Sequence, residues 1–299
     1  MLYKYVNYER ANALLTTKQI RFTQPSDFND PFELHPEFQL MSREDIADLP
    51  PALDESGNVI AGMRQLTPEA LQRMMSAVMP HLARMAPVHA QHPGASFAID
   101  NNAVGREYYD QHFGILSLTE SPDNLLMWAH YGDNHKGVVI GFDEQHLFFK
   151  GAEIVVGLNC LNKVEYNQKR PVLSPTTQKN PKVFLRKSTE WAYEKEWRLI
   201  RSLNAAATVV PKDNIPSVYL FDVPVEAIRV IITGSQMQPD QYQEICALRT
   251  ESADLQHMKI HHAQLSKEEY ALEIHPALTE EEERERLKGK AMSAKSFDI

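Results

Sequence analysis

The chain has 299 residues, 43% of them hydrophobic and 24% charged, so it can bury a full core, and global disorder is excluded. Its formal net charge of -9 argues against broad electrostatic binding to DNA or to an anionic membrane, although a local basic groove is compatible with it. Two cysteines, Cys160 and Cys246, are too few for a disulfide framework, and their apolar neighbours predict buried free thiols. Because no apolar run has signal-peptide or membrane-span length, we expect a cytoplasmic protein.

The first residues predict a strand, a helix and a second strand. Residues 2–6 are typical of a short strand, and residues 8–17 carry apolar side chains at helical spacing. Residues 19–23 alternate apolar and polar side chains, which predicts the second strand. Turn-forming residues then fill positions 25–33.

Residues 36–106 differ from the rest of the chain and predict a helical insertion that covers one side of the core. Thr67 and Pro68 favour a helix start, with Thr67 as the N-cap. The apolar stripe that follows is rich in methionine, which indicates core filling in preference to a cofactor site.

The second half of the chain predicts more strands than helices. A helix that begins at 121–124 and ends at Gly132 follows a strand at 114–119. Residues 228–262 predict a βαβ-like unit that closes the fold. The other predicted elements are a helix at 181–191 and strands at 137–142, 154–158, 164–166, 194–201 and 218–221.

These elements predict one mixed α/β domain of the α+β class over residues 1–275, with a central mixed sheet flanked by helices. Residues 276–299 predict a charged helix or tail, because Thr279 caps an acidic first turn. No low-complexity linker divides the chain.

Residues 194–198 (EKEWR) are the most informative polar motif. Strand alternation would place Glu194, Glu196 and Arg198 on one face and Trp197 on the other. One interpretation is a surface ion-pair ladder. The other is a carboxylate directed at a ligand hydroxyl or at a developing cation.

Two further motifs could contact a ligand. In residues 28–33 (FNDPFE), Asn29 and Asp30 either close an Asx-type turn or bind a polar ligand. In residues 127–132 (MWAHYG), Trp128 and Tyr131 could stack a planar base, with His130 as a donor or acid. Alternatively, Trp128 belongs to the core and His130 caps the helix.

Several strong signatures are absent from the sequence: a glycine-rich phosphate loop, GxGxxG, paired CxxC, HExxH and GxSxG. The adjacent His261 and His262 lie in a predicted strand, where only one of the two can face a given side. We therefore expect no zinc site and no metal.

Five segments together resemble the bacterial domain-of-unknown-function family numbered 2971. They run in that family's order between about residues 2 and 250, and the combination is specific although each piece alone is weak. The segments are 2–5 (LYKY), 28–33 (FNDPFE), 127–131 (MWAHY), 135–143 (HKGVVIGFD) and 191–198 (WAYEKEWR).

The chain is also similar, more remotely, to the ADP-ribosyltransferase fold, which implies a partly split sheet and NAD as the substrate. In that fold the first strand carries a His or Arg, a central strand a Ser, Thr or Tyr, and a later strand a Glu. The resemblance implies that the first position is taken by Tyr3, Lys4 and Tyr5, or by Arg21 on the next strand. Ser117 takes the second, and Glu194 and Glu196 match the Glu-x-Glu of arginine-modifying members. The chain departs from the pattern at Lys4, which replaces the usual His or Arg.

Three hypotheses of function follow. In the first, an NAD-consuming transferase or hydrolase uses Glu196 as its catalytic carboxylate, Glu194 assists, Ser117 shapes the nucleotide pocket, and a toxin, effector or phage-defence role would suit it. In the second, a nuclease holds Mg²⁺ with carboxylates and lines a phosphate path with cations. Its residues would be Asp30, Glu33, Glu194, Glu196, Lys187, Lys195 and Arg198. In the third, the same residues form a non-catalytic pocket or partner surface. The expected partner is a nucleotide or other small molecule, with the protein or nucleic-acid acceptor left open and no membrane.

Overall fold

The fold is described by a computed structural model. It covers residues 1–30, 32, 37–38, 109–151, 159–170, 172–173, 184–211 and 217–276. The predicted helical insertion, apart from residues 37–38, lies outside the described residues, and so do the predicted strand at 154–158 and the charged C-terminal tail.

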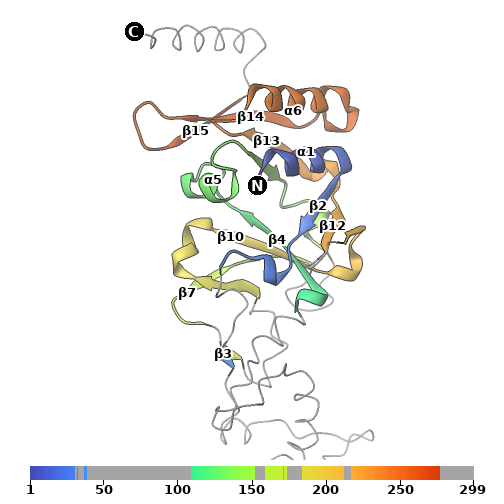
Figure 1. The fold of residues 1–299 in the computed structure, drawn as a ribbon, viewed down its shortest axis with the longest axis vertical. Coiled ribbons are helices and arrows are strands. Elements are labelled where there is room, and N and C mark those ends of the chain that lie inside the picture. Colours follow the sequence, from blue (N-terminus) through green and yellow to red (C-terminus); the bar gives the residue numbers. More distant parts are fainter. Residues whose placement is uncertain are drawn as a thin grey trace, which may run out of the picture.

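An eight-stranded mixed sheet forms the centre of the molecule, in the order β15-β14-β13-β5-β1-β4-β10-β6 (Figure 1). Neighbouring strands are antiparallel except β13 and β14, which are parallel and are connected along the chain by helix α6 (Pro239–Glu251). The predicted α+β class and the closing βαβ unit are therefore confirmed. The strands are β1 (Leu2–Val6), β4 (Phe113–Thr119), β5 (Val138–Phe142), β6 (Leu161–Lys163), β10 (Glu196–Ser202), β13 (Ile228–Thr233), β14 (Lys259–Leu265) and β15 (Leu272–Pro276).

Smaller sheets lie beside the central one. A three-stranded sheet has the order β11-β12-β2, and β7 pairs with β9 in parallel, as does β3 with β8. The strands are β2 (Gln19–Phe22), β3 (Glu37–Phe38), β7 (Glu165–Asn167), β8 (Val172–Leu173), β9 (Arg186–Ser188), β11 (Thr208–Val210) and β12 (Val218–Asp222). Short 3-10 helices are η1 (Pro25–Asp27), η3 (Leu147–Phe149), η5 (Thr189–Glu194), η6 (Leu203–Ala205), η7 (Val225–Ala227) and η8 (Ala253–Leu255).

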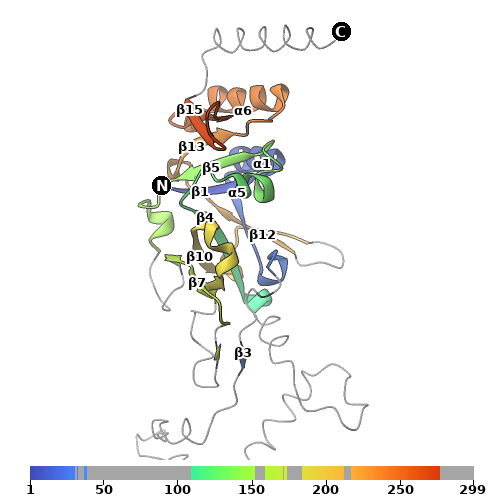
Figure 2. The same ribbon diagram turned by 90° about the vertical axis from the view of Figure 1, so that its left-hand side faces the viewer.

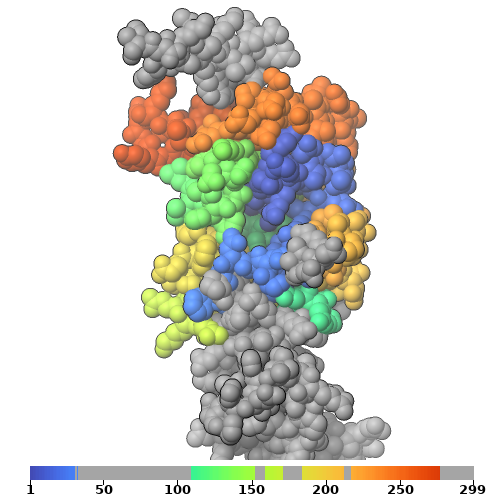
Figure 3. Space-filling model, in the orientation of Figure 1, coloured from blue at the N-terminus to red at the C-terminus, as the bar shows by residue number. Residues whose placement is uncertain are grey.

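The central sheet is split between β1 and β4. These two strands share one pair of residues, Tyr3 with Thr119, whereas β1 pairs with β5 over its whole length. Further along β4, Ile115 exchanges both main-chain hydrogen bonds with Thr23, which directly follows β2, at 2.9 Å each. Ser117 thus lies on β4 where β10 continues the ladder on one side, opposite Arg198, whereas neither β1 nor Thr23 pairs with it on the other side. Figure 2 shows the two parts of the sheet one above the other, and Figure 3 shows the surface hollowed between the blue N-terminal segments and the green α5.

Local signals explain the two helices nearest the split. Helix α1 (Tyr8–Thr17) begins at Asn7, whose side chain accepts from the main-chain N–H of Arg10 at 3.0 Å. Helix α5 (Leu125–Tyr131) begins at Asn124, whose side-chain oxygen accepts from two main-chain N–H groups, and it ends at Gly132. A Cβ at position 132 would lie 2.6 Å from the ring of Trp128, so the sequence needs glycine there.

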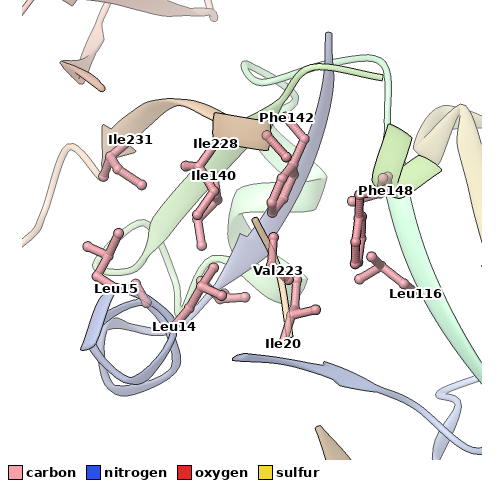
Figure 4. Packing of buried hydrophobic residues seen from close by; sticks show 14 of the residues in the cluster. Leu14, Leu15, Ile20, Leu116, Ile140, Phe142, Phe148, Val223, Ile228 and Ile231 are labelled. Atoms are coloured by element: carbon pink, nitrogen blue, oxygen red, sulfur yellow. The ribbon is translucent and has the colours of Figure 1, made fainter. Parts of the chain in front are cut away.

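The sheet has a core on each face. On one face, Leu14 and Leu15 of α1 pack against Ile140 of β5 and Ile231 of β13, and Ile245 of α6 joins the same cluster (Figure 4). On the other face, α5 places Trp128 and Met127 against side chains of β1, β5 and β13. The helices therefore cover both faces of the five strands that end at β1.

The structure departs from the sequence predictions in four places. The helix predicted over 181–191 is wrong from residue 184 on, because this segment forms β9 and then η5. Glu194 belongs to η5, and β10 begins only at Glu196. Strand β15 and the sheet around β12 were not predicted. Both cysteines are free thiols, but they are partly exposed instead of buried.

The close packing of α1 on the sheet makes its core leucines sensitive to truncation. We expect Leu15→Ala, at a side chain 1% exposed, to lower the free energy of unfolding by about 2–5 kcal/mol in urea denaturation. The control is Leu147→Ala, at a side chain 80% exposed, which should change stability by less than about 0.5 kcal/mol. Equal effects of the two changes would contradict this assignment of the core.

Candidate functional site

Four charged side chains form a buried cluster on β9, η5 and β10, which we call the charge cluster: Lys187, Glu194, Glu196 and Arg198. The Lys187 amine donates to Glu194 Oε2 at 2.6 Å and lies 3.5 Å from Glu196 Oε2. Arg198 binds the Glu196 carboxylate with two parallel bonds of 2.8 Å, from Nε to Oε1 and from Nη2 to Oε2. All four side chains are 5% exposed or less.

The backbone explains how two carboxylates meet here. Glu196 and Arg198 are two apart on β10 and so share a face, as predicted from alternation. Glu194 reaches the same place by another route, because Lys195 adopts a left-handed conformation (φ 44°) that ends η5. The Thr119 hydroxyl anchors this turn by donating to the main-chain oxygen of Glu194 at 2.6 Å. The prediction that Glu194 lies on the strand is wrong, but its placement beside Glu196 is correct.

Burial makes the ionic balance of the charge cluster essential. Burial alone would lower the pKa of Lys187, but the carboxylates of Glu196 and Glu194 raise it, so the amine is protonated. Burial raises the pKa of Glu196, Lys187 lowers it, and Glu194 raises it further. The bidentate bond to Arg198 favours the ionised carboxylate. With two cations and two carboxylates the cluster is neutral, and the alternative of a surface ion-pair ladder is wrong.

The FNDPFE motif packs beside the charge cluster. The ring of Phe28 lies 5.2 Å from the Arg198 guanidinium, and Asp30 is close enough to oppose the lowering of the Arg198 pKa by burial. Asp30 also accepts from the main-chain N–H of Phe32 at 2.9 Å, so the Asx-type turn is confirmed. Asn29 lies beside the hydroxyl of Tyr131.

Two tyrosines hold the charge cluster in place: Tyr131 of α5 and Tyr166 of β7. The Tyr131 hydroxyl donates to Glu194 Oε1 at 2.8 Å, and burial together with Glu194 raises the pKa of Tyr131. The main-chain N–H of Glu196 donates to the hydroxyl of Tyr166 at 2.8 Å. Each carboxylate is thus held in one orientation.

A different set of polar groups lies at the split between β1 and β4: Lys4, Ser117 and Arg21. The Lys4 amine crosses it to donate to the main-chain oxygen of Ser117 at 3.1 Å. Burial, followed by Arg10, lowers the pKa of Lys4 to about 8; Glu196 opposes the shift and Arg21 adds to it. The Ser117 hydroxyl is buried beside Glu196 and makes no hydrogen bond of normal geometry, and neither does the buried Nε of Arg21.

Not all predicted residues join this site. Trp128 is fully buried and its ring N–H donates to Pro122, while Tyr5 packs against it edge-on and donates to Ser121. Neither ring can stack a ligand base, so the core interpretation of Trp128 is confirmed. Tyr3 is partly buried on the same face as Tyr5, and His130 is exposed at the end of α5.

Sequence reasoning missed the role of Lys187 as the partner of both carboxylates. The helix predicted over 181–191 contains Lys187, and the sequence suggests for this residue only a place along a phosphate path. The sequence around the EKEWR motif does not predict the contact of Lys187 with the two carboxylates, because this contact depends on the pairing of β9 with β7.

No group of three or more His, Cys, Asp or Glu side chains in the described part of the chain is arranged to hold a metal ion. No helix in the same residues has the length and apolar character needed to cross a membrane.

The model of a family described as "Protein of unknown function (DUF2971)" matches residues 127–199. The predicted resemblance is thereby confirmed, and the DUF2971 segment includes Tyr131 and the whole charge cluster, whereas Lys4, Asn29, Asp30 and Ser117 precede it. No curated protein and no solved structure gave a significant match.

The neutrality of the charge cluster gives a test within the DUF2971 segment. We expect Lys187→Met to lower the free energy of unfolding by about 3–5 kcal/mol, because it leaves an unpaired buried carboxylate. The double variant Lys187→Met/Glu194→Gln restores neutrality and should recover part of that loss in urea denaturation. Lys195→Met, at an exposed neighbour, is the control, and a loss as large as that of Lys187→Met would contradict the cluster.

The lowered pKa of Lys4 predicts a dependence of stability on pH. Between pH 8 and 10.5, the ordinary pKa of a lysine, the unfolded chain binds more protons at this residue than the folded chain does. The free energy of unfolding contributed by Lys4 therefore increases as pH rises through this window. Relative to Lys4→Met, the wild type should gain about 2 kcal/mol between pH 7.5 and 10. A constant difference in urea denaturation would contradict it.

Proposed function

We propose that the chain cleaves the bond between nicotinamide and ribose in NAD and transfers ADP-ribose to an acceptor or to water. The observation that carries the proposal is the approach of the Ser117 hydroxyl to the Glu196 carboxylate at the split in the sheet, where that hydroxyl is buried and makes no hydrogen bond of normal geometry. A buried hydroxyl with a poor hydrogen bond is costly, and a ligand that supplies a better partner would remove that cost.

The order of the strands supports the proposal. Lys4, Ser117 and Glu196 lie on β1, β4 and β10, three consecutive strands of the central sheet. The ADP-ribosyltransferase resemblance implies a basic residue, a hydroxyl and a glutamate on separate strands around one site. The Lys4 amine and the Glu196 carboxylate influence each other electrostatically, so these groups share one environment.

The chemistry that we propose needs a carboxylate near the ribose. As the bond from C1′ to the pyridinium nitrogen breaks, its electron pair stays on nicotinamide, which leaves as a neutral molecule. The ribose becomes an oxocarbenium-like cation, and a nucleophile then adds to C1′ and loses its proton. A carboxylate of Glu196 would accept a bond from a ribose hydroxyl and stabilise that cation. Each oxygen of Glu196 can accept more than the bonds it has.

A second candidate function, a non-catalytic nucleotide-binding module, is favoured by one observation. Both oxygens of Glu196 are already bound by Arg198, and its side chain is 5% exposed. Such a carboxylate is well suited to hold a wall of a pocket rigid. The nuclease hypothesis is less favoured, because protein cations already neutralise the Glu194 and Glu196 carboxylates.

The two candidates differ in the release of nicotinamide. Purified protein would be incubated with NAD labelled in the nicotinamide ring, with and without cell lysate as a source of acceptor. We expect Glu196→Gln and Ser117→Ala each to reduce release by about a hundredfold or more. Glu190→Gln, at an exposed residue of η5, is the control and should retain the wild-type rate.

Release that survives Glu196→Gln at the wild-type rate would exclude this residue as the catalytic carboxylate. If the wild type releases no nicotinamide yet binds NAD in calorimetry, the binding module is correct and the enzyme is not. Cleavage of nucleic acid that EDTA abolishes would favour the nuclease instead.

A further inference from the structure

We propose that a basic pocket lined by β9, by the segment that ends β7 and by the FNDPFE motif binds the diphosphate of the nucleotide. The proposal rests on the proposed function for the nucleotide itself, but the pocket and its charge stand independently of any reaction. The pocket has a volume of about 220 Å³. The residues that line it are Asp30, Phe32, Asn167, Gln168, Lys169, Arg170, Arg186, Lys187 and Ser188.

The charge of the lining favours an anion. Three cations of the lining lie outside the neutral charge cluster (Lys169, Arg170 and Arg186), and Asp30 is the one carboxylate of the lining. The fourth cation, Lys187, is already paired with Glu194 and Glu196. This concentration of positive charge occurs in a chain whose net charge is -9. Lysine and arginine together are the usual ligands of phosphate groups in proteins, with arginine binding two oxygens at once.

Arg186 lines this pocket and has a donor that makes no hydrogen bond of normal geometry. Its Nε is buried, makes no hydrogen bond of normal geometry, and lies 3.6 Å from the Glu165 carboxylate, which orients the guanidinium without satisfying that donor. The pairing of β9 with β7 in parallel places Arg186 opposite Glu165 and Ser188 opposite Asn167. The two short strands therefore present their polar side chains as a fixed unit.

The pocket shares two residues with the candidate catalytic site. Lys187 lines the pocket, and its amine bonds to Glu194 and approaches Glu196. Asp30 also lines the pocket and acts on Arg198. A diphosphate bound here would thus lie next to the charge cluster. One nucleotide could contact both regions.

Size and net charge favour a small molecule over a nucleic acid. The volume is below that of sites for complete drug-sized ligands, so it suits the phosphate portion of a nucleotide. A nucleic-acid backbone would also meet the repulsion of the acidic chain outside the pocket.

Calorimetry with inorganic pyrophosphate and with ADP tests the pocket without requiring catalysis. Lys169→Ala/Arg170→Ala changes two exposed side chains of the lining and should not affect folding, which thermal unfolding checks. We expect the wild type to bind both probes and the double variant to bind each about tenfold or more weakly. Lys259→Ala/Lys267→Ala removes two exposed cations on and after β14, near the opposite end of the sheet, and should leave binding unchanged.

Three outcomes would overturn the proposal: no binding of either probe to the wild type, equal weakening in both double variants, or tighter binding of an oligonucleotide than of ADP. Pyrophosphate binding that depends on Lys169 and Arg170 would support the pocket even if the protein released no nicotinamide. Failure of the reaction and failure of the pocket are therefore distinguished.

Discussion

The arrangement of this molecule around β10 depends on keeping a buried set of charges neutral. Arg198 is fully buried and its guanidinium has no route to water, so Glu196 must lie beside it on the same face of the strand. The second carboxylate, Glu194, then requires a second cation, which Lys187 supplies from β9. This requirement accounts for the left-handed turn at Lys195 and for the short parallel pair β7–β9, because both bring a charged group to the others. Buried ion pairs of this kind contribute more to a unique arrangement than to net stability.

The split in the sheet is the second constraint, and it connects the N-terminal strand to the charge cluster. On the side away from β10, strand β4 is bonded to β1 near its end and to the residue after β2 near its start, which leaves Ser117 without a paired residue on that side. Lys4 compensates in part by donating to the Ser117 carbonyl. A polar gap of this kind in an otherwise aliphatic sheet is a natural place for a ligand, because the main-chain and side-chain groups there are already positioned.

The regular elements could be predicted from sequence and the site only in part. Leu2–Val6, Tyr8–Thr17 and Val138–Phe142 follow from local patterns of apolar side chains, and the end of α5 follows from Gly132. The pairing of Glu196 with Arg198 is also local, since the two residues are adjacent on one strand face. The contact of Lys187 with Glu194 depends on strand pairing, and the contact of Lys4 with Ser117 joins residues far apart in the sequence. Neither contact can be predicted from side-chain periodicity. The DUF2971 match shows that residues 127–199 resemble other proteins, but it assigns no chemistry to them.

The two groups of charges differ in their access to solvent ions. Mobile ions screen exposed charges over a Debye length of about 8 Å at physiological ionic strength, but they screen a closed and neutral cluster very little. Lys169 and Arg170 are exposed, whereas the members of the charge cluster are not. Added salt should therefore weaken the attraction of the surface for an anion while the fold around β10 stays intact. The protein could release such a ligand in response to ionic strength without loosening the framework that positions it.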